Sequence, residues 1–568
     1  MVKVDNNTLV NISAQRFERL REQGAFYIDK TEFIREWWEK GSDVTLITRP
    51  RRFGKTLNMS MLECFFSLKY ADKKNLFENL EIWKEEKYRN LQGTYPVISL
   101  SFANVKTDTF EKTKTRICQI LTDLYIKLDF LKDSTSFTQK DREYFDRICE
   151  GMPETDATIA LHKLCDYMQR YYGKKPIVLL DEYDTPMQEA YVHGFWDELV
   201  TFTRNLFNAT FKTNPYLERA IMTGITRVSK ESIFSDLNNI KVVSTTSDEY
   251  AEAFGFTEEE VFAGMDEQGL IEKNEVKKWY DGFTFGNKKD IYNPWSILNY
   301  LDTGKIGIYW ANTSSNSLVE KLIREGSSDV KIVMEDLLNG KAFHGVIDEQ
   351  IAFNQLGRKT SALWSLLLAS GYLKIEHYEF NIQKRKTEYD LAITNMEVQC
   401  MFEQMISDWF MEYTPHYNKF VTALLSGNLK EMNVYMNKVA LNTISYFDTG
   451  KRPSGSEPER FYHGLVLGLL VELYDKYVIT SNRESGYGRY DVIMEPRKGE
   501  KSAIILEFKV REPNEERSLE ETANAALQQI EEKEYGQILL EKGISPEHIQ
   551  KYGFAFEGKN VLIKKYEN

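Results

Sequence analysis

Short apolar runs alternate with stretches of helical periodicity over the first 250 residues of the chain. The runs lie at residues 43–48 (DVTLIT), 96–102 (PVISLSF), 177–180 (IVLL) and 220–223 (AIMT). Apolar runs this short, without polar alternation, are typical of parallel strands that are covered on both faces. Because amphipathic stretches separate them, the pattern predicts an α/β fold in which helices connect the strands of a parallel sheet.

The pattern changes twice further along the chain. From about residue 250 to about residue 440 helical periodicity dominates, with isolated strand-like pieces. Residues 448–458 (DTGKRPSGSEP) concentrate Gly, Pro, Ser and charge, which is typical of a surface linker. The remainder predicts the order helix, three strands, helix and strand, with the last strand near residues 553–563. We therefore expect an α/β domain in residues 1–250, a mostly helical or mixed middle region in residues 251–447, and a second α/β domain in residues 459–568.

The composition is that of a folded chain with several domains. Of the 568 residues, 42% are hydrophobic and 13% are aromatic, more than disordered chains carry. The net charge of −13 argues against a protein coated in nucleic acid, although a local basic groove is compatible with it.

Two further classes of protein are excluded by what the sequence lacks. The five cysteines and seven histidines are scattered and include no C-x-x-C pair, so neither a disulfide framework nor a zinc cluster is indicated. No apolar run approaches the roughly 18 uncharged residues that cross a bilayer, and the N-terminus lacks the apolar middle of a signal peptide. We therefore expect a cytoplasmic protein that does not bind membranes.

Residues 48–56 (TRPRRFGKT) join the first apolar run to the helix that follows it. At such a junction Gly54 leaves backbone amides free to face phosphate oxygens, Lys55 reaches the outer phosphates and Thr56 offers a hydroxyl to magnesium. The standard spacing has a glycine six residues before the lysine, where this sequence has Arg49, so we expect the loop to turn differently. The motif predicts a nucleotide site, and a helix start that merely contains GKT is the alternative.

A second motif, which is acidic, strengthens the prediction of a nucleotide site. Residues 176–186 (PIVLLDEYDTP) form an apolar strand that ends in two acids. Such a strand typically delivers an aspartate to magnesium and a glutamate to the attacking water. Asp181 is the expected metal partner, through water, and Glu182 is the expected general base.

Hydroxyl and basic side chains elsewhere fit the same site. Thr223 ends another apolar strand, where it could sense the outermost phosphate, and Arg227 follows it. Arg227 is expected either to stabilise developing charge or to lie in a solvated basic turn. Arg49 and Arg52 present a similar choice between phosphate contacts and a basic rim that binds another partner.

Near the end of the chain, two strand-like segments carry Asp491 (GRYDVIM) and the pair Glu507 and Lys509 (AIILEFKV). Side chains alternate across a strand, so Glu507 and Lys509 point to one face, where Asp491 of the neighbouring strand can meet them. Two carboxylates can hold a hard divalent ion, and the lysine can orient or deprotonate a water that attacks a phosphodiester. These residues predict a metal-dependent nuclease, and a charged edge strand is the alternative.

Two flanking residues are candidates for the same site. Glu459 starts the preceding helix, where it is either a further carboxylate or an ordinary partner of the helix dipole. Gln529 lies on the polar face of the following helix.

Several longer motifs resemble a known family. The sequence is similar to the bacterial AAA-ATPase-like proteins, and its end is similar to the PD-(D/E)XK nuclease-superfamily domain commonly fused behind them. The motifs that carry the first resemblance are YIDKT, TRPRRFGKTLNMSML, LLDEYDTP, TGITRVSKESIFSDLNN, WYDGFTFG and IYNPWSI, and those that carry the second are ERFYHGLVLGLL, SNRESGYGRYDVIM, IILEFKV and ALQQIEEKEYG.

The resemblance implies a P-loop ATPase fold followed by a restriction-endonuclease-like fold. It matches Lys55 and Thr56 to the Walker A pair, and Asp181 and Glu182 to Walker B. It also matches Asp491, Glu507 and Lys509 to the nuclease signature.

The first hypothesis is therefore an ATP-dependent or ATP-regulated nuclease that uses Mg²⁺ and acts on DNA or RNA. A nucleotide-dependent switch or scaffold, whose nuclease-like domain binds nucleic acid or protein without cutting, is the alternative. A transport or remodelling ATPase is a third reading. The sequence leaves the oligomeric state open, with a homo-oligomer among the alternatives, and aromatic residues such as those of 279–285 (WYDGFTF) are interpreted as packing.

Overall fold

The computed structural model divides into two compact units, and each is described by itself. The first unit comprises Met1–Ser314 and His344–Val398, and the second comprises Ser315–Phe343 and Gln399–Asn568. The expected middle region, 251–447, is thus shared between the two units. The described residues are 9–227, 234, 237–313, 317–324, 326–348, 356, 359–411, 414–447, 457–485, 487–497, 502–511, 516–557 and 560–566.

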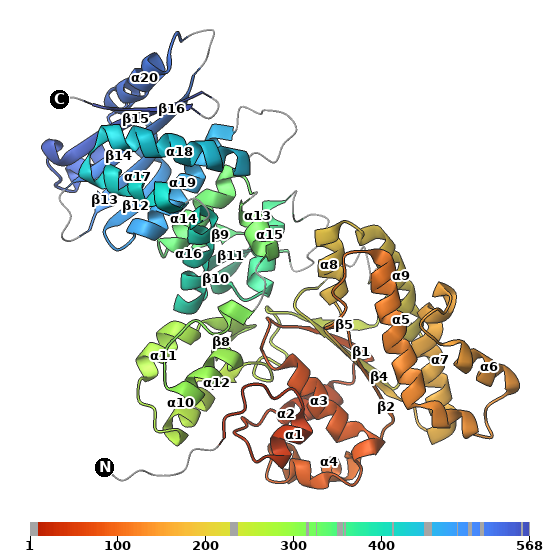
Figure 1. Ribbon diagram of the computed structural model, residues 1–568. Coiled ribbons are helices and arrows are strands. Elements are labelled where there is room, and N and C mark those ends of the chain that lie inside the picture. The colour runs from red at the N-terminus through yellow and green to blue at the C-terminus, as the bar shows by residue number, and fades with distance from the viewer. Residues whose placement is uncertain are drawn as a thin grey trace. The chain divides into compact units, whose positions relative to one another are not determined.

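A five-stranded parallel sheet lies at the centre of the first unit (Figure 1). Its strand order is β2-β3-β4-β1-β5, and the four apolar runs identified in the sequence form the strands β1 to β4. The predicted α/β architecture is therefore confirmed. The strands are β1 (Val44–Thr48), β2 (Val97–Ser101), β3 (Ile177–Asp181), β4 (Arg219–Gly224) and β5 (Ile240–Val243).

Helices cover both faces of this sheet, which explains why its strands β1 and β3 are buried along their whole length and mostly apolar. In Figure 1, α1 to α3 lie on one side of the strands and α5, α7 and α9 lie on the other. The helices are α1 (Phe17–Glu22), α2 (Glu32–Lys40), α3 (Lys55–Phe66), α4 (Glu86–Leu91), α5 (Phe110–Lys127), α6 (Gln139–Arg147), α7 (Glu154–Tyr172), α8 (Thr185–His193) and α9 (Trp196–Phe211).

The rest of the first unit contains helices and two small antiparallel sheets, with strand orders β6-β8-β7 and β10-β11-β9. The hairpin of β10 and β11 is longer than the isolated strand-like pieces expected in the middle region, because its many charged residues mask the alternation of a strand. The elements are α10 (Glu258–Glu267), α11 (Lys273–Tyr280), α12 (Pro294–Thr303), α15 (Thr360–Ala369), β6 (Phe256–Thr257), β7 (Phe283–Phe285), β8 (Lys288–Tyr292), β9 (Phe343–Gly345), β10 (Leu373–Asn381) and β11 (Lys386–Ile393).

The second unit is built on a mixed sheet with the order β12-β13-β14-β15-β16, in which only β14 and β15 run parallel. The predicted order of elements is confirmed except at the end, where the single strand expected near 553–563 is the antiparallel pair β15 and β16. The strands are β12 (Tyr477–Ser485), β13 (Gly488–Pro496), β14 (Ala503–Val510), β15 (Ile549–Glu557) and β16 (Asn560–Lys565). The helices are α13 (Ser317–Arg324), α14 (Ser328–Leu338), α16 (Met396–Met411), α17 (Thr414–Ser426), α18 (Leu429–Phe447), α19 (Glu457–Leu473), α20 (Leu519–Glu532) and α21 (Gln537–Glu541).

Helix side chains cover both edge strands of this second sheet. On β16, the amide of Asn433 in α18 donates to Ile563 O at 2.9 Å and accepts from Ile563 N at 2.8 Å. On β12, Ser481 N donates to the carboxylate of Glu335 in α14 at 2.6 Å. Burial raises the pKa of Glu335 to about 7. The two edges therefore have partners for backbone groups that an open sheet would leave exposed.

Gly553 sets how closely α20 approaches the sheet. A Cβ atom at this position would lie 2.5 Å from Ala523 O and 3.0 Å from Leu527 Cγ, both in α20. Gly553 is also the partner of Glu507 in the β14–β15 pairing. The missing side chain therefore lets α20 pack directly over the part of β14 that carries the predicted nuclease residues.

We predict that Gly553→Ala lowers the free energy of unfolding of the second unit by about 1–3 kcal/mol, because the added methyl group must push α20 away. Urea denaturation followed by circular dichroism measures the change. Gly536→Ala is the matched control, since its Cβ would meet only Ile549 Cδ1 at 3.9 Å. Equal stabilities for the two variants would contradict this account of the packing.

Candidate active sites

Three predicted residues of the first unit meet at one edge of the parallel sheet. Asp181 ends β3, Thr223 lies at the end of β4, and Thr56 follows β1 at the start of α3. The carboxyl ends of parallel strands share an edge, which brings these positions together. Asp181 Oδ2 accepts a hydrogen bond from Thr56 Oγ1 at 2.7 Å, and its Oδ1 accepts one from the Thr223 hydroxyl. Burial, followed by the charge of Glu182, raises the pKa of Asp181.

The loop before α3 presents unpaired amides to this edge. Gly54 is the N-cap residue of α3 with φ 80°, and no side chain caps the first turn of this described helix. The first backbone N–H groups of a helix have no partner within it, and the helix dipole favours an anion there. The position of a Cβ on Gly54 has no atom within 4 Å. The start of α3 can therefore receive a phosphate group.

Lys55 is held against its own loop. Its side chain is only 3% exposed, and Nζ donates to Arg49 O at 3.1 Å and to Pro50 O at 3.0 Å. Glu182 Oε1 lies 3.7 Å from the same nitrogen. Glu182 also has φ 55°, a left-handed conformation that costs a residue other than glycine roughly 1–3 kcal/mol. A phosphate bound by Lys55 would have to replace one of these partners.

Arg49 does not lie where the sequence led us to expect it. The side chain is fully buried, donates to Ser244 O at 2.6 Å, and stacks with its Cζ 4.3 Å from the centre of the Phe285 ring. Burial lowers its pKa to about 9. In this conformation Arg49 is neither a phosphate contact nor part of a basic rim; instead it fastens the loop to the segment after β5. Arg52, by contrast, is exposed and stacks 4.2 Å from the centre of the Trp295 ring.

Aromatic residues that follow the parallel sheet in the chain pack against the loop between β1 and α3. Phe53 is fully buried, with its ring centre 4.7 Å from that of Phe283 and 5.5 Å from that of Phe285. Trp310 Nε1 donates to Arg51 O at 3.0 Å. The WYDGFTF segment thus packs against the loop, in agreement with its interpretation as packing.

Sequence reasoning assigned no role to Asp184, the third acid of LLDEYDTP. The structure buries it completely and places its Oδ2 2.9 Å from Thr226 N, on the segment that leads to Arg227. Arg227 itself is half-buried, and within the described part of the chain its Nε is a buried atom with no hydrogen-bond partner. The signal in the sequence was a third acid three residues after the end of a strand, which is also a common way to begin a helix.

In the second unit, Asp491 and Glu507 lie where two strands separate. The pairing of β13 with β14 ends at Val492 and Leu506. Just beyond it, Asp491 N donates to Glu507 Oε2 at 3.2 Å, and Phe508 N donates to Asp491 Oδ2 at 2.7 Å. The two carboxylates thus accept the hydrogen bonds that a continued ladder would have used.

Glu507 is surrounded by the other predicted residues. It is 3% exposed, and burial, followed by the nearby charge of Asp491, raises its pKa to about 9. The positive charge of Lys509 opposes this rise. Gln529 Nε2 donates to Glu507 Oε1 and also to Tyr535 OH at 3.0 Å. Tyr535, which the sequence did not single out, therefore orients Gln529. Glu459 falls within α19, but its side chain lies outside the described residues.

The donor set of this site suits a hard cation. Asp491 and Glu507 supply carboxylate oxygens, which Mg²⁺ prefers, and magnesium sites commonly use one or two carboxylates with water in the remaining positions. Among the described residues, no group of three or more His, Cys, Asp or Glu side chains is arranged to hold a metal ion. A magnesium ion here would therefore need water or substrate oxygens as further ligands.

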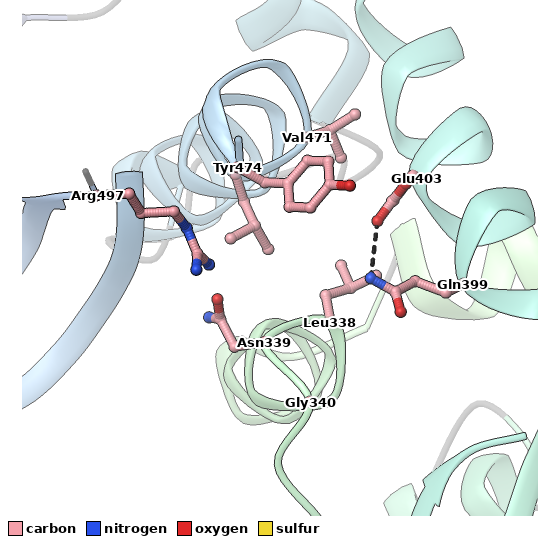
Figure 2. A pocket seen from close by; sticks show the side chains of 9 residues that line it. Leu338, Asn339, Gly340, Gln399, Glu403, Val471, Tyr474 and Arg497 are labelled. Carbon is pink, nitrogen blue, oxygen red and sulfur yellow. Dashed lines mark hydrogen bonds between the residues drawn. The ribbon is translucent and has the colours of Figure 1, made fainter. Parts of the chain in front are cut away.

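A separate cavity of about 200 Å³ lies elsewhere in the second unit. Gln399 Nε2 donates to Glu403 Oε1 at 3.0 Å on one side of the cavity, and Tyr474 and Arg497 also line it (Figure 2). None of the predicted nuclease residues lines it. The cavity is therefore distinct from the candidate nuclease site.

Comparison with known families agrees with these two sites. Residues 11–234 match the family model described as predicted AAA-ATPase, and residues 457–566 match that of the PD-(D/E)XK nuclease superfamily. The chain thus carries an AAA-ATPase-like domain followed by a PD-(D/E)XK superfamily domain. This architecture confirms the resemblance identified in the sequence.

The chain is also similar to a curated protein over nearly its whole length. It is 24% identical over 568 residues to a protein of Azotobacter chroococcum mcd 1 named "Uncharacterized protein in vnfD 5'region", covering 97% of each chain. That name states no activity. None of the described helices is both long enough and apolar enough to span a membrane.

We predict that Mg²⁺ or Mn²⁺ raises the melting temperature of the second unit in the wild-type protein. Binding to the folded state alone contributes about 2.7 kcal/mol at a metal concentration 100 times Kd, which corresponds to several degrees. Glu507→Gln should abolish this rise, because an amide does not supply the anionic ligand. Differential scanning calorimetry with increasing metal measures the effect. Glu520→Gln, at a surface pair with Lys564, is the control and should respond as the wild type does.

Proposed function

We propose that this protein is an ATPase coupled to a magnesium-dependent nuclease domain that cleaves phosphodiester bonds in nucleic acid. The observation that most supports the ATPase half is the hydrogen bond between Thr56 and Asp181, which joins the two halves of the phosphate-binding motif. The network of Asp491, Glu507 and Gln529 supports the nuclease half. Both domains belong to families whose names imply these activities.

In the proposed ATP site, the amides after Gly54 and the ammonium of Lys55 bind the phosphates. Thr56 would hold a magnesium ion, with Asp181 as its partner through water. Glu182 accepts a proton from the attacking water, and the resulting hydroxide displaces ADP from the γ-phosphorus.

Three further residues complete this proposed site. Thr223 contacts the γ-phosphate, and Arg52 and Arg227 neutralise charge that develops on the phosphate oxygens. A bound magnesium ion in either domain would supply charge neutralisation for phosphate oxygens.

In the proposed nuclease site, Asp491 and Glu507 bind the metal ion and Gln529 orients Glu507. Lys509 orients a water and, in its neutral amine form, takes the proton of that water. The oxygen of the water bonds to phosphorus, and the bond from phosphorus to the leaving oxygen breaks, so that the leaving oxygen keeps the electron pair and is protonated by solvent. Glu459, at the start of α19, is proposed as an additional carboxylate. The proposed partner is DNA or RNA, in the cytoplasm, with a homo-oligomer as a candidate assembly.

A nucleotide-dependent switch is the second candidate function. One observation favours it: the contacts of Lys55 with its own loop carbonyls and with Glu182 occupy the group that would bind the phosphates. In a switch, nucleotide binding would release these contacts without turnover, and the C-terminal domain would bind nucleic acid or protein without cutting it.

We predict that Glu182→Gln lowers ATP hydrolysis by about 10²- to 10³-fold, because the general base is lost. Its affinity for ATP should be equal or higher, since a negative charge beside Lys55 is removed. Phosphate release and the fluorescence of a labelled ATP analogue measure the two effects. Glu189→Gln, which alters a surface pair with His193 on α8, is the control. Hydrolysis at the wild-type rate in Glu182→Gln would show that Glu182 is not the base.

We predict that Asp491→Asn reduces magnesium-dependent cleavage of nucleic acid by at least about 10³-fold while ATP binding stays unchanged. Labelled single- and double-stranded DNA and RNA, incubated with Mg²⁺ in the presence and absence of ATP, serve as substrates. Glu520→Gln should cut as the wild type does. Salt-dependent binding without cleavage by the wild type would favour the scaffold, and cutting by Asp491→Asn at the wild-type rate would disprove the assigned metal site.

A further inference from the structure

A buried carboxylate that the proposed reaction does not use holds the segment after β4. We infer that Asp184 is a positioning residue that fixes residues 225–227, and with them Arg227, at the edge of the ATP site. This inference rests on the ATPase half of the proposed function. It assigns a task to the one acid of LLDEYDTP that has no part in the chemistry itself.

The contacts of Asp184 reach two consecutive backbone amides. Its Oδ2 accepts from Ile225 N at 3.0 Å, from Thr226 N at 2.9 Å and from Thr226 Oγ1 at 3.0 Å. The side chain is 0% exposed, so water does not compete for these bonds. Hydrogen bonds are stronger in a buried, low-dielectric environment than in water, and these three together fix the backbone just before Arg227.

Neighbouring residues reinforce this attachment of the end of β4 to the end of β3. Tyr183 N donates to Thr223 O at 2.9 Å, and the Tyr183 hydroxyl donates to Thr226 O at 2.7 Å. A Cβ on Gly224 would lie 2.7 Å from both Asp184 Oδ1 and the Tyr183 ring. Glycine at 224 is therefore what allows the two segments to approach so closely.

Arg227 is the residue whose position this attachment determines. Its Nε is a buried donor that lacks a hydrogen-bond partner in the described part of the chain. A buried donor without a partner is costly, and a phosphate oxygen would supply the missing acceptor. The segment that begins at Ile225 thus carries a guanidinium group whose buried Nε lacks an acceptor among the described residues, only four residues after Thr223, which contacts Asp181.

A second set of contacts connects Asp184 to the phosphate-binding loop. Gln188 in α8 donates to Asp184 Oδ2 at 3.4 Å and accepts from Arg51 Nη2 at 3.2 Å. Arg51 belongs to the loop between β1 and α3. A continuous chain of side chains therefore runs from that loop through Gln188 and Asp184 to the segment that carries Arg227.

A double-mutant cycle on the full-length protein tests the inference. Asp184→Ala and Arg227→Ala should each lower kcat by about 10- to 100-fold with a much smaller change in KM, because both weaken charge stabilisation in the transition state. The double variant should be no slower than Arg227→Ala alone, since Asp184 acts through Arg227. Asp184→Asn should recover much of the activity, because its amide oxygen still accepts from the two backbone N–H groups. Glu189→Ala on α8 is the matched control and should leave kcat unchanged.

The outcomes separate this inference from the proposed function. If ATP is hydrolysed and the two single effects multiply in the double variant, the role of Asp184 is overturned while the ATPase stands. If ATP is bound but not hydrolysed, the ATPase proposal fails, and amide hydrogen exchange at Ile225 and Thr226 tests the inference instead: exchange in Asp184→Ala at the wild-type rate would overturn it. Absence of ATP binding would overturn both. If Asp184→Ala does not fold, Thr226→Val, which removes one of the three donors that residues 225 and 226 offer to Asp184, takes its place in the cycle.

Discussion

The buried carboxylate of Asp181 is the interaction on which the first unit's site depends. One oxygen accepts a hydrogen bond from the hydroxyl of Thr56 at the start of α3, and the other accepts one from the hydroxyl of Thr223 at the end of β4. A buried carboxylate is tolerated only when its oxygens have partners, so these bonds are also a condition for folding. The same contact that satisfies a buried group thereby sets the distance between the phosphate-binding loop and the acidic strand.

Backbone N–H groups donate to buried or half-buried carboxylates in a similar way in the two units. In each, a carboxylate at or just beyond the end of regular strand pairing accepts hydrogen bonds from the backbone next to it. Asp184 accepts from the segment after β4, and Asp491 accepts from Phe508 in β14. Such positions combine a rigid backbone with a desolvated charge. A ligand that brings compensating charge then interacts in a medium of low dielectric constant, where each contact is strong.

Much of the fold could be predicted because it depends on local patterns. The four apolar runs became β1 to β4, and the positions of Lys55, Asp181 and Thr223 followed from the common edge of parallel strands. Arg49 could not be predicted, because its partners Ser244 and Phe285 lie about 200 residues away and no local rule brings them close. Tyr535 was missed for a similar reason, since its role in the site depends only on its hydrogen bond with Gln529. β15 and β16 were expected as one strand because the break between them is short.

The helix side chains that occupy both margins of the C-terminal sheet limit how copies of this protein can associate. The side-chain amide of Asn433 on α18 forms the hydrogen bonds with β16 that a further strand would form. The carboxylate of Glu335 on α14 accepts a hydrogen bond from Ser481 N. Addition of a strand from another copy at either edge would require the helix on that edge to give up these hydrogen bonds first. Both edges of this sheet are thereby protected against edge-to-edge pairing with another chain.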